Sequence, residues 1–269
     1  MIETMAPVAE QYQRFVESDA TASAEELRAV MARQGYLFFR GLAPAEEVLA
    51  VRQVVAEYCA EAGWLHPAHD PLEGVVARGV QPTTEGKPEY TAVYRKVLKH
   101  PLFHDFPTLP APMNVARALL GDQVFVHPRR IGRMTFPNYT EVTTPPHQDY
   151  YYIRGSVNTY SCWVPLGDCP ITLGGLAVWP GTHTGGYIDH TVHHPGAVGG
   201  CGVPVDPTQA EWHTTDYKAG DVLFFTTFTI HKALPNLTPD RMRFSTDNRY
   251  QRPEEDIDPS ALKPHFSLS

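Results

Sequence analysis

The first 120 residues carry apolar residues at the spacing of α-helices. Ser23 and Glu26 form the signature of a capping box, an apolar stripe follows, and Gly35 is placed to end the helix. A second helix is predicted after Pro44, with Val48, Val51, Val55 and Tyr58 at helical spacing, and a third over Met113–Leu120. Residues 67–87 are rich in Pro, Gly and charge and predict a loop. We therefore expect a helical flank over about residues 1–120.

From about residue 121 the pattern changes to short β-prone runs separated by Pro, Gly and Asn. The runs are Gln123–His127, Thr159–Pro165, Gly175–Trp179, Asp221–Phe225 and Arg243–Tyr250, with an earlier buried run at Tyr36–Phe39. Such spacing is typical of a β-sandwich or barrel. We interpret the chain, 1–269, as a single domain that is mainly β with flanking helices and has a barrel core over about 121–252.

One long interruption of the barrel pattern, residues 184–217, holds Gly and His with little periodicity. Segments of this length inside a compact domain are usually functional lids or else disordered. We expect a lid.

Composition narrows the range of partners. The formal net charge is -8 and no block of Lys and Arg occurs, which argues against nucleic acid and anionic membranes. No run approaches the roughly 18 apolar residues of a membrane span, and the N-terminus lacks the apolar region of a signal peptide.

The cysteines are scattered without metal-type spacing: Cys59, Cys162, Cys169 and Cys201. Free thiols in a reducing cytoplasm are expected.

The segment Pro145-Pro146-His147-Gln148-Asp149 is the first candidate for chemistry. In a strand, positions i and i+2 share a face, so His147 and Asp149 would project together and could grip one cation. On its own this tripeptide favours a surface pair in a tyrosine-rich strand.

His231 changes that balance. It follows the β-prone run Thr226–Ile230, far along the chain from His147 and Asp149. Two histidines and one carboxylate on a barrel form the facial triad of ferrous oxygenases, which leaves open coordination positions. A lone His231 would more often be a core histidine, but together the three residues favour a metal site.

Arg243-Phe244-Ser245 supplies a candidate anion clamp. Arg243 and Ser245 share a face of the strand after His231, and a guanidinium fork with a hydroxyl matches a carboxylate. Arg241 has the same parity and stays an alternative. Both arginines could instead lie on the barrel surface.

These residues resemble the phytanoyl-CoA dioxygenase family of iron(II) and 2-oxoglutarate oxygenases. The resemblance spans most of the chain and rests on these segments: Gly35–Leu42, His147-Gln148-Asp149, Trp163–Leu166, Gly174–His183, and His231 with Asn236 and Arg243. It implies a double-stranded β-helix (a jelly-roll, cupin-like barrel) and an enzyme that uses Fe(II), 2-oxoglutarate and O2. Such an enzyme releases succinate and CO2 while it hydroxylates a C–H bond of a small molecule.

Other site residues are less fixed by the pattern. Trp163 either packs on the cosubstrate or fills the core. Arg133 and Arg130 precede His147, and one of them could meet a carboxylate of cosubstrate or substrate, although surface ion pairs are the alternative. By strand alternation Tyr151 shares the metal-facing side and is a candidate for the substrate pocket.

The same residues are also compatible with several other functions. The same chemistry could serve desaturation, epoxidation or ring closure, and a silent cupin-like metal-binding protein or a zinc hydrolase would keep the same ligands. Asp149 argues against a halogenase, which needs an open position there. The sequence specifies neither the substrate nor the oligomeric state.

Overall fold

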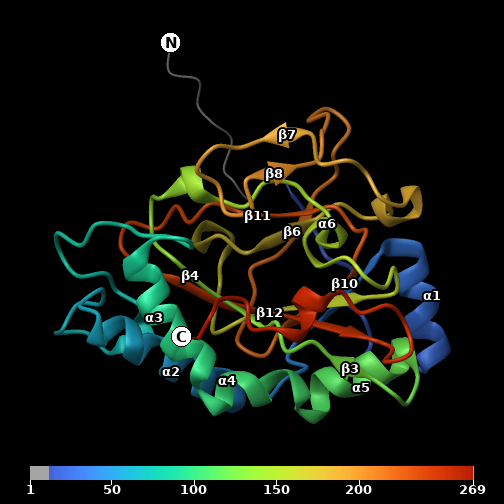
Figure 1. Cartoon of the computed structure of the whole chain (residues 1–269), viewed down its shortest axis with the longest axis horizontal. Helices are drawn as coiled ribbons and strands as arrows, with labels where there is room; N and C mark the ends of the chain where they lie inside the picture. Colours follow the sequence, from blue (N-terminus) through green and yellow to red (C-terminus); the bar gives the residue numbers. More distant parts are fainter. Residues whose placement is uncertain (1–11, 269) are drawn as a thin grey trace.

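The computed structural model describes residues 12–268, which form two packed β-sheets with helices outside the larger sheet (Figure 1). The helices are α1 (Ala24–Gln34), α2 (Ala45–Glu61), α3 (Pro88–Lys99), α4 (Pro101–Asp105), α5 (Pro110–Leu120) and α6 (Asp149–Ile153). The strands are β1 (Gln13–Arg14), β2 (Tyr36–Phe39), β3 (Phe125–Val126), β4 (Ile131–Thr135), β5 (Tyr160–Pro165), β6 (Leu176–Val178), β7 (Val192–His193), β8 (Cys201–Gly202), β9 (His213–Thr214), β10 (Val222–Thr226), β11 (His231–Ala233) and β12 (Arg243–Gln251). Most of the N-terminal stretch used to judge a signal peptide lies outside the described residues.

The sheet topology is that of a double-stranded β-helix with helices added, which confirms the predicted fold class. The larger sheet has the order β2-β10-β5-β12-β3, and β4 also pairs with β12. The smaller sheet has the order β1-β9-β6-β11, and β7 and β8 form a separate hairpin. The register places Ser245 of β12 between Arg133 of β4 and Pro165 of β5.

Strands β2, β5 and β10 of the larger sheet are buried over almost their whole length, because one face meets the smaller sheet and the other meets the helices. In β2, Tyr36 and Phe38 belong to the core between the sheets, whereas Leu37 and Phe39 pack in the core that the helices share. On β5, Trp163 faces the smaller sheet and its neighbours face the helices. This period of two explains why these strands read as continuous apolar runs.

The predicted helices form where their end signals lie. Ser23 and Glu26 make the reciprocal capping box of α1, and Gly35 ends the helix in the left-handed region with φ 78°. The helices predicted after Pro44 and over Met113–Leu120 are α2 and α5, and α5 begins three residues earlier than expected. Residues 88–105, for which the sequence pattern predicts no element, form α3 and α4, each with Pro in its first turn.

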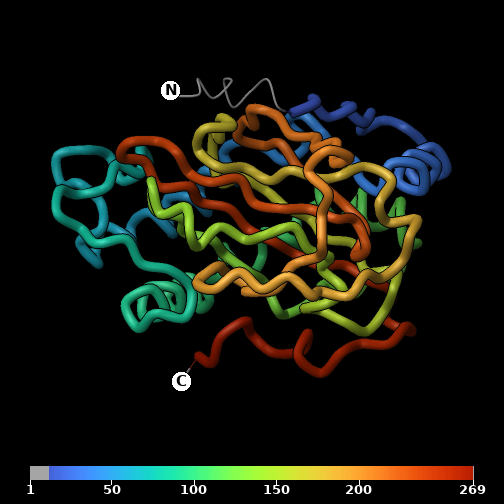
Figure 2. The backbone as a smooth tube through the Cα atoms, turned by 90° about the horizontal axis from the view of Figure 1, so that it is seen from above, coloured from blue at the N-terminus to red at the C-terminus, as the bar shows by residue number. Residues whose placement is uncertain are grey.

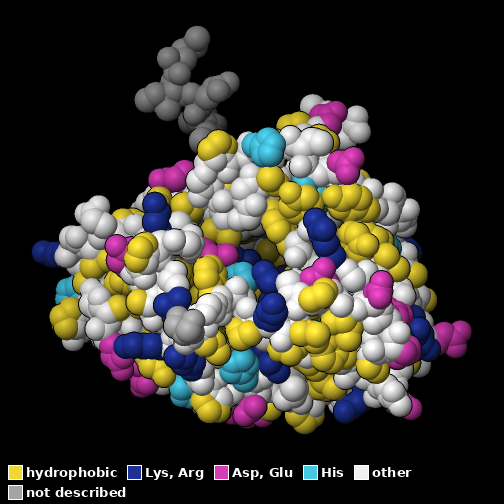
Figure 3. Space-filling view, in the orientation of Figure 1, with side chains coloured by type: hydrophobic (Ala, Val, Ile, Leu, Met, Phe, Trp, Pro, Cys, Tyr) yellow, Lys and Arg dark blue, Asp and Glu magenta, His cyan; other side chains and the backbone are white. Residues whose placement is uncertain are grey.

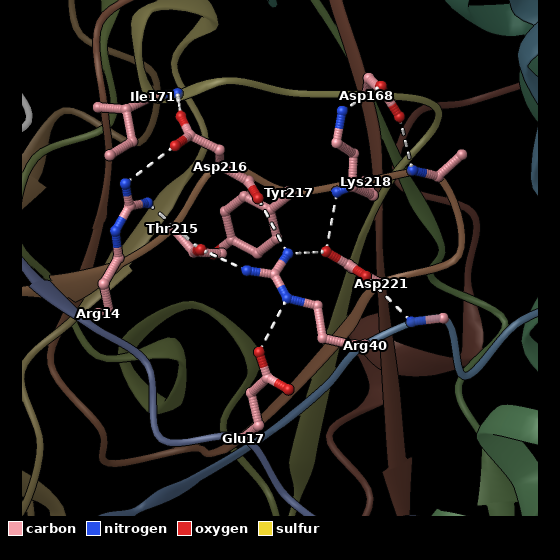
Figure 4. Close-up of polar contacts among 12 residues, drawn as sticks. Arg14, Glu17, Arg40, Asp168, Ile171, Thr215, Asp216, Tyr217, Lys218 and Asp221 are labelled. Carbon is pink, nitrogen blue, oxygen red and sulfur yellow. Dashed lines mark hydrogen bonds and ion pairs between the residues drawn. The ribbon is translucent and has the colours of Figure 1, made fainter.

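A polar network around Arg40 fastens the edge of the larger sheet (Figure 4). The Arg40 guanidinium donates to the Asp221 carboxylate at 2.6 Å, the Glu17 carboxylate at 3.1 Å and the Thr215 hydroxyl at 2.7 Å. Asp221 is 1% exposed and also accepts from the backbone N–H of Gly41 at 3.0 Å. The network therefore joins the end of β2 to the turn before β10.

The segment after β12 runs along one side of the molecule toward the C-terminus (Figure 2). The backbone N–H of Arg129 donates to Ala261 O at 3.3 Å, and Tyr94 Oη lies 3.0 Å from His265 Nδ1. These contacts hold the C-terminal segment against the body of the protein. Within residues 12–268 no helix has the length and apolar character needed to cross a bilayer.

Candidate metal and cosubstrate site

His147 and His231 are held side by side by a short antiparallel bridge at the edge of the smaller sheet. Each backbone N–H donates to the other's carbonyl, at 2.9 and 3.0 Å. His147 Nδ1 lies 2.8 Å from Pro145 O, and His231 Nδ1 lies 3.0 Å from Thr229 O. Because a carbonyl only accepts, each Nδ1 carries the proton and each Nε2 presents a lone pair, as a metal ligand requires.

Asp149 completes the group from a helix, not from the strand that the sequence analysis expected. It is the first residue of α6, and it is 3% exposed. His231 also begins β11 instead of ending a strand. The expected pairing of His147 and Asp149 on one strand face is therefore wrong in its geometry, although the two side chains do converge.

The three ligand atoms can hold one ion. Asp149 Oδ1 lies 3.8 Å from His147 Nε2 and 3.7 Å from His231 Nε2, and all the candidate donor atoms lie within 4.8 Å of one another. Two donors bound to one ion at about 2.1 Å are at most about 4.2 Å apart, so both distances fit a shared metal. All three residues are buried.

The charge states suit a divalent cation. Burial and the neighbouring His147 lower the pKa of His231 to about 3, so that its imidazole is neutral. Burial alone would raise the pKa of Asp149, but the Arg249 guanidinium and the two histidines hold it well below its usual range. The site therefore offers the neutral imidazole of His231 and a carboxylate anion beside the second imidazole ligand, His147.

Arg249 and Ser161 orient the carboxylate from the larger sheet. Arg249 Nη2 donates to Asp149 Oδ2 at 3.0 Å, and the Ser161 hydroxyl donates to the same oxygen. With Oδ2 occupied, Oδ1 is the oxygen left facing the histidines. The sequence pattern predicts no role at the metal site for either residue, although Arg249 lies on the same face of β12 as Arg243 and Ser245.

Arg243 is a buried cation without a counter-ion. It is 5% exposed, its Nη1 donates to Ser245 Oγ at 2.5 Å, and its Nε has no hydrogen-bond partner. Within residues 12–268 its side chain makes no ion pair. Arg241 is half-exposed and lies 3.9 Å from the Glu73 carboxylate. The buried pocket therefore presents Arg243 and not Arg241.

The triad and Arg243 line one cavity of about 760 Å³, its mouth included. Trp163 is 2% exposed, packs on Tyr217 in the core and also lines this cavity, and its contact with the cosubstrate stays a prediction. Arg133 also lines the cavity, but its guanidinium is bound by Glu85 at 2.7 Å and Asp247 at 3.2 Å. Arg133 is therefore already neutralised within the protein.

Two expected pocket residues lie elsewhere. Arg130 meets His104 Nδ1 at 3.1 Å and is not among the residues that line the cavities around the triad. Tyr151 stacks on His190 and is likewise absent from both linings. Because α6 is helical, the residue that follows Asp149 onto the same face is three positions on, and Tyr152 lines a cavity and packs on His147.

Residues 184–217 cover the segment that carries the metal ligands. Val198 lines both cavities around the triad, and its backbone N–H donates to Val142 O at 3.0 Å. Gly202 of β8 approaches so closely that a Cβ there would lie 2.6 Å from Pro146 O. This segment therefore lies against Val142 and Pro146, and its role as a lid stays a prediction.

A β-helix that carries two histidines and one carboxylate beside a buried arginine defines the class of non-haem iron oxygenases. The sequence profile of the phytanoyl-CoA dioxygenase (PhyH) family matches residues 31–245. The chain belongs to this family, as predicted, and is a 2-oxoglutarate-dependent non-haem iron enzyme.

Known proteins with the same architecture agree with this class. The 1-deoxypentalenic acid 11-beta-hydroxylase of Streptomyces exfoliatus is 28% identical over 232 residues, which cover 81% of this chain and 77% of the relative. The epimerase SnoN, solved with Fe3+, alpha ketoglutarate and nogalamycin RO, is 25% identical with a TM-score of 0.59, covering 88% and 86% of the two chains. EctD from S. alaskensis with bound Fe shares the fold at 19% identity and a TM-score of 0.57, covering 95% and 84%.

Proposed function

We propose that this protein acts as one catalytic domain that hydroxylates an unactivated C–H bond of a small-molecule metabolite, with Fe(II) held by His147, Asp149 and His231. The observation that carries this proposal is the convergence of the three buried ligands beside an uncompensated buried arginine. When bound, ferrous iron with 2-oxoglutarate and O2 supplies an oxidative decarboxylation to succinate and CO2 and the oxidising power to attack such a bond.

The chain's own residues would bind, orient and shield the reactants. Arg243 and Ser245 would hold the distal carboxylate of 2-oxoglutarate, because the guanidinium is buried without any other anion. Trp163 would form a wall of that pocket. Arg249 would keep Asp149 Oδ2 away from the metal, so that one oxygen of the carboxylate coordinates.

A small-molecule substrate is supported by relatives whose names specify hydroxylation of 1-deoxypentalenic acid and by a structure that contains nogalamycin RO. SnoN is named an epimerase and SnoK a carbocyclase, so a change of stereochemistry or a ring closure is the second candidate outcome. The four free cysteines, three of them buried, support a reducing cytoplasm as the site of action.

The test measures iron content and succinate release for the wild type and the variants His147→Ala, Asp149→Ala and His231→Ala. Each variant should lose most bound iron and all succinate release, because a facial triad has no spare ligand. His127→Gln is the matched control, since His127 is a buried histidine that lies outside the candidate ligand set and lines neither cavity beside the triad. Full activity in a triad variant would remove that residue from the proposed site.

A further inference from the structure

A second cavity adjoins the first beside the triad. It has about 450 Å³, its mouth included, and shares His147, Asp149 and Arg249 with the first cavity. Neither Arg243 nor Trp163 lines it. Several residues line the second cavity alone: Arg129, Ile131, Tyr152, Ile153, Gly199 and His265. The part of the second cavity beside Arg129 and His265 therefore lies outside the pocket at Arg243.

Of the three arginines that line this cavity, two have a carboxylate partner in the described part of the chain and one does not. The carboxylates of Glu85 and Asp247 neutralise Arg133, and Asp149 neutralises Arg249. Arg129 has no side-chain hydrogen bond or ion pair within residues 12–268, and its Nε is buried without a partner. One positive charge in the cavity wall is thus left without an anion.

A second donor next to this charge is also unused. Arg249 has a side chain only 4% exposed, and among residues 12–268 its Nη1 finds no partner, although Nε and Nη2 both reach Asp149. Buried polar groups without partners are uncommon in native proteins, and they often mark a place where a ligand binds. Figure 3 shows Lys, Arg and His side chains beside a hollow at the centre of this face.

The pKa of His265 is affected by the same excess of positive charge. Its ring lines the cavity from the C-terminal segment, with Tyr94 Oη at 3.0 Å and the Glu85 carboxylate at 3.5 Å. Burial and the charges of Arg133, Arg129 and Arg249 lower the pKa of His265 to about 2. The imidazole therefore stays neutral, and the cation that remains for a ligand is Arg129.

We propose that the second cavity binds the carboxylate of an organic-acid substrate through Arg129, with Arg249 Nη1 as an additional donor. This inference rests on the proposed function, whose substrate it specifies. A single free guanidinium fork matches one carboxylate bidentately, and its one positive charge balances a carboxylate but not a phosphate dianion. Ile131, Ile153 and Val198 would contact the carbon body.

The bound carboxylate would fix the position of the substrate relative to the metal. Arg249 contacts Asp149 on one side and lines the second cavity on the other, so an acid bound there lies next to the metal ligands. The C–H bond that faces the metal would then depend on its distance from the carboxylate. Arg129 is a specificity residue in this account, since it does not touch the metal ligands.

The experiment titrates monocarboxylates into the anaerobic protein loaded with Fe(II) and 2-oxoglutarate, using calorimetry. The probes are acetate, cyclohexanecarboxylate and octanoate, each paired with its primary amide. The acids should bind saturably and at least about tenfold more tightly than the amides. Arg129→Gln should weaken the acids about ten- to hundredfold, the value of a hydrogen bond to a charged group, and leave the amides unchanged.

Arg130→Gln is the matched control, since Arg130 is the next residue and lies off the cavity. Unchanged 2-oxoglutarate affinity in Arg129→Gln would show that the variant is folded. Equal binding of acids and amides, absence of saturable acid binding, or a wild-type response of Arg129→Gln would overturn the inference. 2-Oxoglutarate is also titrated alone into the Fe(II)-loaded protein, and failure of this binding would refute the proposed function. The acid titration is repeated without cosubstrate, so that the role of Arg129 is tested separately.

Discussion

Replacing Arg243 by Met tests the cosubstrate pocket, because the two side chains have similar length but only arginine carries charge. In the wild type the buried guanidinium meets Ser245 and no carboxylate. The distal carboxylate of 2-oxoglutarate would be its counter-ion. Removing one partner of a buried pair costs about 3–5 kcal/mol. At 1.4 kcal/mol per decade this predicts a loss of about two to three and a half decades in affinity.

The assay is anaerobic calorimetry of 2-oxoglutarate binding to the Fe(II)-loaded variants. Arg243→Lys should keep part of the affinity, since the charge remains but the fork is lost. Thermal unfolding without 2-oxoglutarate should show Arg243→Met to be no less stable than the wild type, because an unpaired buried cation is itself unfavourable. Arg241→Met is the control and should bind normally, since Arg241 is half-exposed. Wild-type affinity in Arg243→Met, or the loss in Arg241→Met instead, would refute this reasoning.

Three further predictions concern the lid, the sheet edge and acid stability. Gly202→Ala should loosen residues 184–217, because its Cβ would meet Pro146 O at 2.6 Å, and limited proteolysis should cut there faster than in Gly185→Ala, where a Cβ meets nothing. Arg40→Ala should lower the free energy of unfolding by about 1.5–3 kcal/mol, since it leaves the buried Asp221 carboxylate short of a donor, and unchanged urea midpoints would contradict this. Burial lowers the pKa of His127 to about 4, below its value in the unfolded chain. The folded state therefore binds fewer protons than the unfolded state, and the free energy of unfolding should fall as the pH drops from about 6.5 toward 4. The slope from His127 is about 1.4 kcal/mol per pH unit, and urea unfolding of His127→Gln should show a slope smaller by that amount.

The sequence predicts the fold well because its signals are local. The capping box at Ser23, the left-handed Gly35 and the alternation of Tyr36–Phe39 each act within a few residues. The sequence pattern does not predict α3 and α4, because Pro88 and Pro101 at their starts are typical of turns as well as of the first turn of a helix.

The site was predictable in its residue types and less so in its geometry. His147 and Asp149 were found by chemistry, but strand alternation placed Tyr151 in the pocket where helix α6 places Tyr152. Arg249 reaches Asp149 across 100 residues of sequence, and the pairing of β12 with β5 places Arg249 beside Ser161, which binds the same carboxylate oxygen. No pattern within one segment contains that contact.

The most direct test of the central claim is a single-turnover measurement of cosubstrate decarboxylation. The anaerobic protein is loaded with Fe(II) and 2-oxoglutarate labelled at its 1-carboxylate, O2 is admitted, and labelled CO2 is counted against bound iron. The site of His147, Asp149 and His231 predicts iron-dependent CO2 and succinate in equal amounts, with neither formed by His231→Ala. Bound iron and bound 2-oxoglutarate without CO2 would contradict the account and identify a metal-binding protein that keeps the barrel without its chemistry.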